Sequence, residues 1–298
     1  MLTLTVGKNG EDYYTIQEAI NAVPYEEKAR IIISEGLYEE KIFSDKSDIS
    51  LEGKGKVVIR WSDFAKEMMP DGLKRGTFRS YSAFFSGKKL YLENLRIENT
   101  AGKGADVGQA LALYLDVDDA RLKDVELYGH QDTLFLSPLP EKEREKRGFY
   151  GPRCFSKRKL NRVIYEGGEI SGGVDFIFGG ADAIFHSVRI ISNEPGYVSA
   201  PSGFRKDTGF VFHDCVFVNG GVEKESVYLM RPWRKEGKSA FINCTYSDHI
   251  NSKGFIAWTG LESEKESASF KADTPLFGEE YLMSDAEREA LLKRFQEN

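Results

Sequence analysis

The chain has 298 residues, of which 41% are hydrophobic, so it can bury a substantial core as one large domain or as two smaller ones. Its 41 basic and 47 acidic side chains give a formal net charge of -6, which argues against nucleic acid as the main partner. The 3 cysteines lack the spacing of a disulfide framework or a zinc site, and no group of Asp, Glu and His has metal-ligand spacing, so we expect no metal and no cofactor.

The first residues, MLTLTVGKNGEDYY, do not resemble a signal peptide, because no basic segment precedes an apolar run. No stretch of the sequence is long and apolar enough to span a bilayer. We therefore expect no membrane partner. The sequence as it stands predicts a cytoplasmic protein, and a secreted one if a leader has been removed.

Helical periodicity is confined to the two ends of the chain. Thr15 and Glu18 have the spacing of a capping box at the start of TIQEAINAV, and Pro24 ends that helix. Ser284 and Glu287 repeat the cap near the C-terminus. The apolar stripe of this second helix consists of Leu291, Leu292 and Phe295. We expect both helices to cap the ends of the fold.

Between the helices, short alternating strands are broken by glycine, and several share the pattern apolar, any, small polar, apolar, any, apolar. The copies are LENLRI at 92, LKDVEL at 122, the looser YEGGEI at 165, FHSVRI at 185, FHDCVF at 212 and FINCTY at 241. An internal repeat with loops of variable length is typical of a coil of stacked strands. The repeat therefore predicts an all-β fold, a parallel β-helix.

In such a coil, equivalent residues of the repeat lie above one another. The predicted ladder consists of Leu95, Val125, Gly168, Val188, Cys215 and Cys244. Its two cysteines would then fill the core. The competing fold is a β-sandwich of hairpins, but the two-residue Asn-Gly and Asp-Gly turns that join hairpin strands are rare here. A coil of this kind carries its function in an elongated surface groove, which suits a polymeric ligand.

Four segments hold polar residues that a strand-rich core would not choose. They are GQALAL with Gln109, GHQDTLF with Gln131 and Asp132, VDFIFG with Asp175, and LMRPWR with Arg231 and Trp233. Asp175 is flanked by Val174 and by three further apolar residues, so it should be paired, protonated or part of some chemistry. Each polar residue alone could belong to a loop, cap or rim, whereas their combination indicates a site.

These four segments, in this order, resemble the signature blocks of the carbohydrate esterases called pectin methylesterases or pectinesterases. The family blocks read approximately as a QAVAL-like segment, QDTL, DFIFG and LGRPW, and this chain has QALAL, QDTL, DFIFG and LMRPW. The resemblance extends to YTIQEAINAVP and to GFIAWTG near residue 260. It implies a right-handed parallel β-helix with capping helices, formed as a single domain by residues 1–298.

The resemblance also implies a role for each residue. Asp175 would be the nucleophile, Asp132 the general acid and then base, and Arg231 the partner that orients Asp175. Gln109 and Gln131 would donate amide hydrogen bonds to the oxyanion. The residues expected to contact substrate are Trp233, Phe178, Phe135 and Val174. The implied reaction is hydrolysis of methyl esters on galacturonate residues of pectin or oligogalacturonides, with release of methanol, and we expect a monomer.

The chemistry needs these residue types. A carboxylate that attacks the ester carbonyl must be ionised, and Arg231 favours this by lowering the pKa of Asp175. Asp132 must begin protonated, and burial beside a second carboxylate raises its pKa. A glutamine amide is a suitable oxyanion donor because it stays neutral.

The chain departs from the family pattern in the segment 137–162, which is longer than usual. Residues 141–147 alternate Glu with Lys or Arg, which is typical of a solvated loop or a short surface helix. Only positive charges follow from Arg153 to Arg162. Our hypothesis is that this basic arm overhangs the groove and contacts free carboxylates of partly demethylated substrate, which would favour short oligogalacturonides over long pectin. The alternative is a solvated basic face.

Two other functions stay open from the sequence. Pectate lyases and polygalacturonases also use β-helices and acidic residues, although the lyases need calcium and a basic residue, and the glycosidases need carboxylates on both sides of the glycosidic bond. A carbohydrate-binding coil without catalytic activity would keep Trp233 and the groove but would not need both aspartates.

Overall fold

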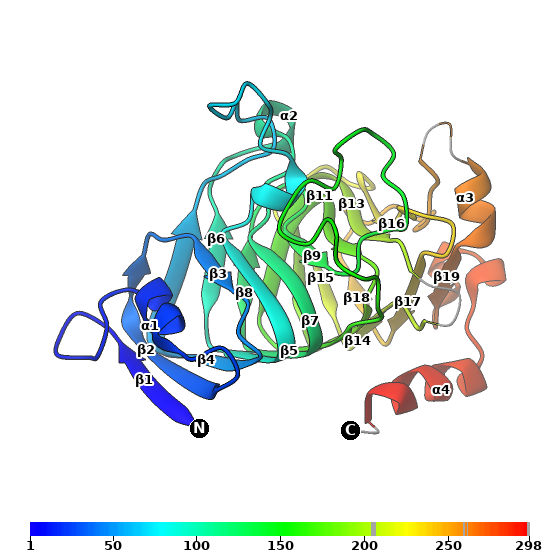
Figure 1. The fold of residues 1–298 in the computed structure, drawn as a ribbon. Coiled ribbons are helices and arrows are strands. Elements are labelled where there is room, and N and C mark those ends of the chain that lie inside the picture. The colour runs from blue at the N-terminus through cyan, green and yellow to red at the C-terminus, as the bar shows by residue number, and fades with distance from the viewer. Residues whose placement is uncertain (204–206, 259, 261, 297–298) are drawn as a thin grey trace.

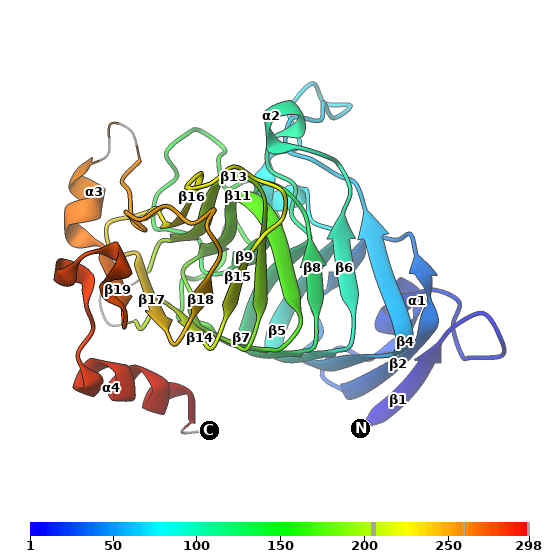
Figure 2. The same ribbon diagram turned by 180° about the vertical axis from the view of Figure 1, so that it is seen from behind.

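The computed structural model describes residues 1–203, 207–258, 260 and 262–296, so residue 259 of the GFIAWTG segment lies outside it. Parallel strand pairing dominates the molecule. Within the described ranges, every pairing between two named strands is parallel. The chain winds as a coil whose successive turns stack side by side, with the N-terminal strands at one end and the C-terminal strands at the other (Figures 1 and 2). The predicted all-β class is confirmed, and the competing sandwich of antiparallel hairpins is wrong.

The stacked strands form three faces, which we call A, B and C and which the chain visits in that order in each turn. Face A contains all or part of β1 (Leu2–Val6), β2 (Lys28–Tyr38), β4 (Asp48–Trp61), β5 (Ala83–Glu93), β7 (Leu113–Lys123), β10 (Arg162–Glu166), β12 (Asp182–His186), β14 (Phe210–His213), β17 (Lys238–Ile242) and β19 (Ser269–Ala272).

Two long strands bend to serve faces B and C in turn, namely β11 (Glu169–Gly179) and β13 (Arg189–Pro201). Face B contains their first halves together with β6 (Arg96–Asn99), β8 (Glu126–Tyr128), β15 (Val216–Asn219), β18 (Thr245–Tyr246) and the end of β4. Face C contains their second halves together with β3 (Ile42–Ser44), β9 (Leu134–Leu136), β16 (Val227–Met230) and the first halves of β5 and β7.

The sequence repeat marks the corner between faces A and B. Its small polar residue adopts a left-handed backbone, with φ of 54° at Asn94, 49° at Asp124, 56° at Ser187, 56° at Asp214 and 51° at Asn243. Short polar residues tolerate this conformation better than bulky ones, because their side chains bond locally. This corner explains why the third position of the repeat is small and polar.

The predicted ladder is confirmed by the hydrogen bonds that join successive turns. In each turn the residue after the ladder position donates its N–H to the ladder carbonyl of the previous turn. The bonds are Glu126 to Leu95 at 2.8 Å, Glu169 to Val125 at 3.1 Å, Arg189 to Gly168 at 3.1 Å, Val216 to Val188 at 3.1 Å and Thr245 to Cys215 at 2.9 Å. Cys215 is buried and Cys244 packs against the core, as predicted.

The main core fills the interior of the coil. Equivalent phenylalanines of successive turns stack there, with ring centroids 4.8 Å apart for Phe185 and Phe212 and 4.9 Å apart for Phe212 and Phe241. A second apolar cluster lies on the outer side of face C, and the candidate site rests on it.

The helices are few and short. The capping box of α1 (Ile16–Ala22) forms as predicted, and this helix covers the N-terminal end of the core. The cap of α4 (Asp285–Gln296) also forms, since Ser284 N–H donates to Glu287 Oε2 at 2.8 Å. However, α4 packs its apolar stripe against the outer side of face A, beside Ile184 and Val211, and does not close the end of the coil as we expected. The other helical elements are α2 (Gly104–Val107), α3 (Glu262–Ser267), η1 (Thr77–Arg79), η2 (Pro275–Phe277) and η3 (Glu279–Tyr281).

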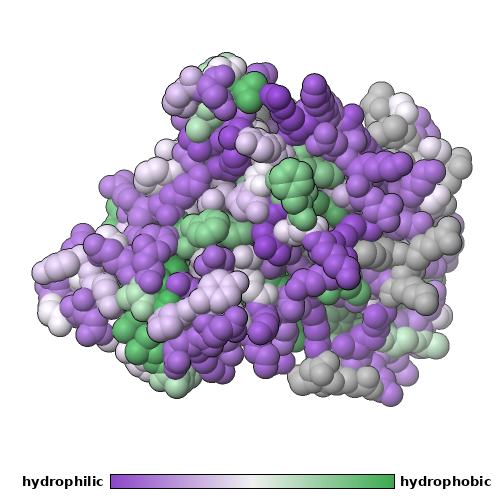
Figure 3. Space-filling model, in the orientation of Figure 1, coloured by the Kyte–Doolittle hydropathy of each residue, from purple (hydrophilic) through white to green (hydrophobic). Residues whose placement is uncertain are grey.

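The surface seen from the side of Figure 1 is mostly hydrophilic, and hydrophobic residues reach it in separate places (Figure 3). Among the residues that the structure describes, no helix is long and apolar enough to cross a membrane.

Candidate active site

Asp132 and Asp175 occupy equivalent positions on two successive turns of the coil. On face C, Leu134 of β9 pairs with Ile177 of β11. Asp132 lies two residues before Leu134, and Asp175 lies two residues before Ile177. The N–H of Asp132 donates to the carbonyl of Val174 at 3.0 Å. Both aspartates have a left-handed backbone, with φ of 64° for Asp132 and 49° for Asp175. The coil therefore brings together two carboxylates that are far apart in the sequence.

Arg231 directly follows β16, one turn beyond β13, and holds Asp175 through two hydrogen bonds. Its Nε donates to Oδ1 at 2.7 Å and its Nη2 donates to Oδ2 at 2.5 Å. A guanidinium that bonds both oxygens of a carboxylate fixes its orientation as well as its charge. The sequence analysis paired these two residues, and the structure places them in contact.

The Arg231 guanidinium is itself held between two aromatic rings. Its central carbon lies 3.8 Å from the ring centroid of Tyr197 and 3.5 Å from that of Trp258. No sequence motif predicts a role for either ring. Trp258 lies in the GFIAWTG segment, which belongs to the family resemblance without a stated role, whereas nothing in the sequence singles out Tyr197. Rings on both sides of the guanidinium restrict its plane and thereby support its two bonds to Asp175.

Both carboxylates are nearly excluded from solvent, at 7% exposure for Asp132 and 5% for Asp175. Burial, and then the negative charge of Asp175, raise the pKa of Asp132 well above its usual value, while Arg231 opposes the shift. Burial also raises the pKa of Asp175, although its hydrogen bonds and charge interaction with Arg231 lower it. Our expectation that Arg231 lowers the pKa of Asp175 is confirmed in direction, although burial outweighs the guanidinium and leaves the net pKa raised. Since only Asp175 is bonded to that cation, a single proton on the pair resides on Asp132.

The two aspartates open onto a cavity of about 940 Å³. Gln109, Gln131, Phe178, Arg231, Trp233 and Trp258 also line it. Within the described residues, no hydrogen bond involves the side-chain amide of Gln109 or Gln131. Both amides can therefore donate to a group bound in the cavity.

The remaining residues expected to contact substrate do not line the cavity. Phe135 is fully buried in the aromatic cluster on the outer side of face C, where its ring centroid lies 4.9 Å from that of Phe178 and 4.8 Å from that of Tyr114. The prediction of direct substrate contact is wrong for Phe135, because other side chains cover its ring completely. Val174 lies outside the cavity lining and contributes its carbonyl to the bond with Asp132. Phe178 and Trp233 do line the cavity, with ring centroids 5.6 Å apart.

The long segment between β9 and β10 leaves the coil as a large loop (Figure 1). Its first part lines the cavity with residues 144–150. Two contacts hold it to the segment after β16, because Arg144 Nη2 donates to the carbonyl of Trp233 at 2.7 Å and Arg234 Nη2 donates to the carbonyl of Lys142 at 3.1 Å. The loop also contacts η1, because the guanidinium carbon of Arg79 lies 4.6 Å from the ring centroid of Tyr150. Residues 141–147 are exposed and form no regular helix, which confirms the predicted solvated loop, and residues 144–147 of it also line the cavity.

The basic arm from Arg153 to Arg162 does not overhang the cavity, so that hypothesis is wrong. Several of its cations are held by other parts of the chain, with Arg153 on Asp116 and Lys159 on Asp118. Arg158 donates to the carbonyl of Gly203 at 3.0 Å. The positive charges that do reach the cavity come from other segments. They are Lys66, Lys74, Arg75, Arg79, Arg144, Lys146, Arg147, Arg231 and Arg234.

Comparisons with known proteins agree with this geometry. A protein-family model described as Pectinesterase matches residues 3–150 and 156–275. Pectinesterase QRT1 from Arabidopsis thaliana is 31% identical over 278 residues, covering 88% of this chain and 66% of that protein. Two other relatives from the same plant, each described as a probable pectinesterase/pectinesterase inhibitor, are spanned over 42% and 43% of their length, so the chain matches only part of each of these proteins.

Solved structures show the same fold. The pectin methylesterase from Aspergillus niger has a TM-score of 0.69 and 25% identity, with 95% of this chain and 97% of that chain covered. A pectin methylesterase mutant in complex with a hexasaccharide has a TM-score of 0.74 and 24% identity, with 97% of this chain and 95% of that chain covered. The family model covers most of the chain, and the segments that carry the paired aspartates and Arg231 lie within it, so the chain belongs to the pectinesterase family.

Proposed function

We propose that the chain hydrolyses methyl esters on galacturonate residues of pectin or oligogalacturonides and releases methanol. The observation that carries the proposal is the pair of buried carboxylates at equivalent positions of successive turns, of which Asp175 alone is held by Arg231 at 2.7 and 2.5 Å. Membership of the pectinesterase family supports the reaction class. A related structure whose description includes a bound hexasaccharide supports an oligosaccharide ligand.

In the proposed mechanism, the two carboxylates divide the work. Ionised Asp175 attacks the ester carbonyl carbon, and the carbonyl π electrons move onto the oxygen. The tetrahedral intermediate collapses to an anhydride as the bond to methoxide breaks, and Asp132 gives its proton to the leaving oxygen to form methanol. Asp132 then takes a proton from water as that water opens the anhydride. This restores both aspartates and leaves a free galacturonate carboxyl group.

The amides of Gln109 and Gln131 are proposed to stabilise the oxyanion, because both line the cavity and neither is bonded elsewhere in the described residues. Loss of one such donor typically lowers kcat by about 10²-fold or more. Phe178 and Trp233 offer apolar ring surface to the sugars. In this proposal Phe135 does not contact substrate but packs against the ring of Phe178, with ring centroids 4.9 Å apart.

The positive charge around the cavity favours a substrate that already carries free carboxylates beside the ester. We propose that Lys146 and Arg147, on the loop that forms one wall, interact with those carboxylates. This replaces the discarded basic arm with different residues on the same segment. The preference for partly demethylated substrate therefore remains part of the proposal.

The finer features of the fold and its setting are proposals as well. We propose that the coil is a right-handed parallel β-helix and that residues 1–298 act as one domain and as a monomer. A polymeric substrate of the cell wall favours the secreted alternative over the cytoplasmic expectation.

The deciding experiment measures methanol release from methylated pectin by the wild type, Asp132→Asn and Asp175→Asn. Asparagine tolerates the left-handed backbone of both positions, so the variants should fold, and circular dichroism checks this. We expect Asp132→Asn to lose at least about 10²-fold in kcat, the lower end for a group that transfers a proton. Asp175→Asn removes the nucleophile and should lose at least as much. Full turnover by both folded variants would refute the mechanism. Unsaturated ends or new reducing ends without methanol would instead identify a lyase or a glycosidase.

A further inference from the structure

Two of the chain's 4 histidines meet on the outer side of face A, away from the carboxylate pair. His186 ends β12 and His213 ends β14, and they are direct partners in the parallel register of these strands. Each lies two residues beyond an apolar residue, Ile184 or Val211, that packs under α4. Alternate residues of a strand point to the same side, so both imidazoles point outward, next to the region that α4 covers.

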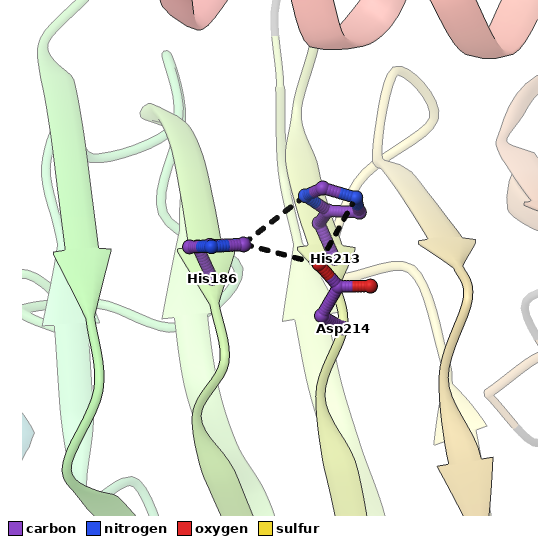
Figure 4. Close-up of side chains that lie close together, drawn as sticks. All are labelled: His186, His213 and Asp214. Carbon is purple, nitrogen blue, oxygen red and sulfur yellow. Dashed lines mark hydrogen bonds and ion pairs between the residues drawn. The ribbon is translucent and has the colours of Figure 1, made fainter.

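Asp214 completes a group of three possible metal ligands. One nitrogen of each imidazole and one oxygen of Asp214 all lie within 4.8 Å of one another. The two Nδ1 atoms are 3.1 Å apart, His186 Nδ1 is 3.6 Å from Asp214 Oδ2, and His213 Nε2 is 3.4 Å from the same oxygen. Figure 4 shows the three side chains turned toward one another from neighbouring strands.

A metal takes only one nitrogen of His213, and the three ligand atoms, one from each residue, lie within 4.8 Å of one another. Ligand atoms about 2.0–2.2 Å from a tetrahedral zinc ion lie roughly 3.3–3.6 Å from one another. The two separations to Asp214 Oδ2, 3.6 Å and 3.4 Å, match this spacing. Imidazole nitrogen with one carboxylate oxygen is a donor set for zinc and similar metals, whereas calcium and magnesium prefer oxygen ligands alone.

The surroundings hold the ligands in place, as the outer partners of a metal site do. Asn243 Nδ2 donates to Asp214 Oδ1, which leaves Oδ2 directed at the imidazoles. The Ser187 hydroxyl lies 3.4 Å from His186 Nε2, so the other ring nitrogen of His186 is the one available to a metal. The parallel register of β12 and β14 fixes the separation of the two rings, whose centroids are 4.9 Å apart.

The two imidazoles also face each other directly, since their Nδ1 atoms are 3.1 Å apart. Without a cation, the two Nδ1 lone pairs would repel unless one ring donates a hydrogen bond to the other.

We propose that His186, His213 and Asp214 form a zinc-binding site that links two successive turns of the coil. Three protein ligands leave a fourth position for water. The sequence analysis expected no metal, because the two histidines are separated by a whole turn of the chain. The proposal does not depend on the proposed esterase activity, since no residue of the site lines the cavity.

Calorimetric titration with zinc ion tests the site, using protein without a histidine tag. The wild type should bind one equivalent with micromolar affinity. His186→Gln, His213→Gln and Asp214→Asn should each weaken zinc binding by more than about 100-fold. Removing a residue that only supports a metal ligand typically costs up to about 100-fold in affinity, and removing a ligand itself should cost more. Glu166→Gln is the matched control, because Glu166 is the exposed register partner of His186 on the preceding turn and is not one of the three ligands.

A second measurement separates ligation from folding. Nuclear magnetic resonance of the imidazole groups during zinc titration should shift the signals of His186 and His213 and leave those of His130 and His249 in place. If a histidine variant fails to fold, Asp214→Asn decides, because asparagine keeps both the left-handed backbone and the bond from Asn243. Absence of saturable binding by the wild type at millimolar zinc, or full-affinity binding by any of the three folded variants, would overturn the proposal.

Discussion

The backbone N–H of Asp132 donates to the carbonyl of Val174, the residue just before Asp175, so one hydrogen bond of 3.0 Å ties the two carboxylate positions together. Both aspartates sit at the same point of the coil, one turn apart, and both have a left-handed backbone. The pair is therefore defined by the coil itself, and the side chains need no long loop to meet. This arrangement leads to predictions about the carboxylates, the guanidinium and the cavity wall.

Asp132→Asn should stabilise the protein at neutral pH. Burial and the charge of Asp175 raise the folded-state pKa of Asp132, so between its unfolded and folded values the folded state binds more protons. The free energy of unfolding then falls as the pH rises from the unfolded-state pKa to the folded-state pKa of Asp132. Asparagine does not ionise, so the variant does not lose this stability. We expect a gain of about 1 kcal/mol at pH 7, typical of relieving a strained catalytic group. Thermal unfolding from pH 4 to 8 measures it, and a gain that does not shrink toward pH 4 would contradict this explanation.

Arg231→Lys should shift the pH dependence of kcat/KM. A lysine cannot make the two parallel bonds of 2.7 and 2.5 Å, so the substitution weakens the interaction with residue 231 that lowers the pKa of Asp175. Because Asp175 must be ionised to attack, the acidic limb of the pH profile should move to higher pH and kcat should fall at neutral pH. Arg189→Lys is the control, since Arg189 pairs with Glu169 on the partly exposed outer surface. An acidic limb that keeps its position would show that Arg231 does not set the ionisation of Asp175.

Trp258→Ala should lower kcat more than it raises KM. The indole lies 3.5 Å from the guanidinium carbon of Arg231, and without it the guanidinium can rotate away from Asp175. Trp258→Phe restores a ring face and should recover most of the lost activity. A loss of about 10-fold in kcat for the alanine variant corresponds to one modest cation–π contact of about 1.4 kcal/mol. Steady-state kinetics on methylated pectin measures this, and an effect on KM alone would assign Trp258 to substrate binding instead.

Reversing the charges of Lys146 and Arg147 to glutamate should raise KM for partly demethylated oligogalacturonides and have less effect on fully methylated ones. Both residues line the cavity, and the free carboxylates of the substrate carry the opposite charge. The shift should weaken at high salt, because exposed charges are screened. Lys157→Glu is the matched control on the same loop, because Lys157 is exposed and lies outside the cavity lining. Equal KM changes for both substrates, or the same change in the control, would rule out this role.

The sequence alone determined the coil and its register. The small polar residue could be recognised as part of a sequence repeat, because short polar side chains tolerate the left-handed backbone of the corner better than bulky ones, and the ladder from Leu95 to Cys244 follows from the repeat. A carboxylate among apolar neighbours indicated that Asp175 is paired, protonated or part of some chemistry. The resemblance to the pectinesterase blocks then singled out Asp132, Asp175 and Arg231 together.

Only the tertiary structure decided which side chains meet and which face solvent. It buried Phe135, placed residues 144–150 rather than the basic arm at the cavity, and brought Tyr197 and Trp258 against Arg231. It also let burial outweigh Arg231 in setting the pKa of Asp175. The physical reason is that a local pattern fixes the backbone conformation and the alternation of sides. Desolvation and contact depend instead on atoms contributed by turns and loops that are distant in the sequence.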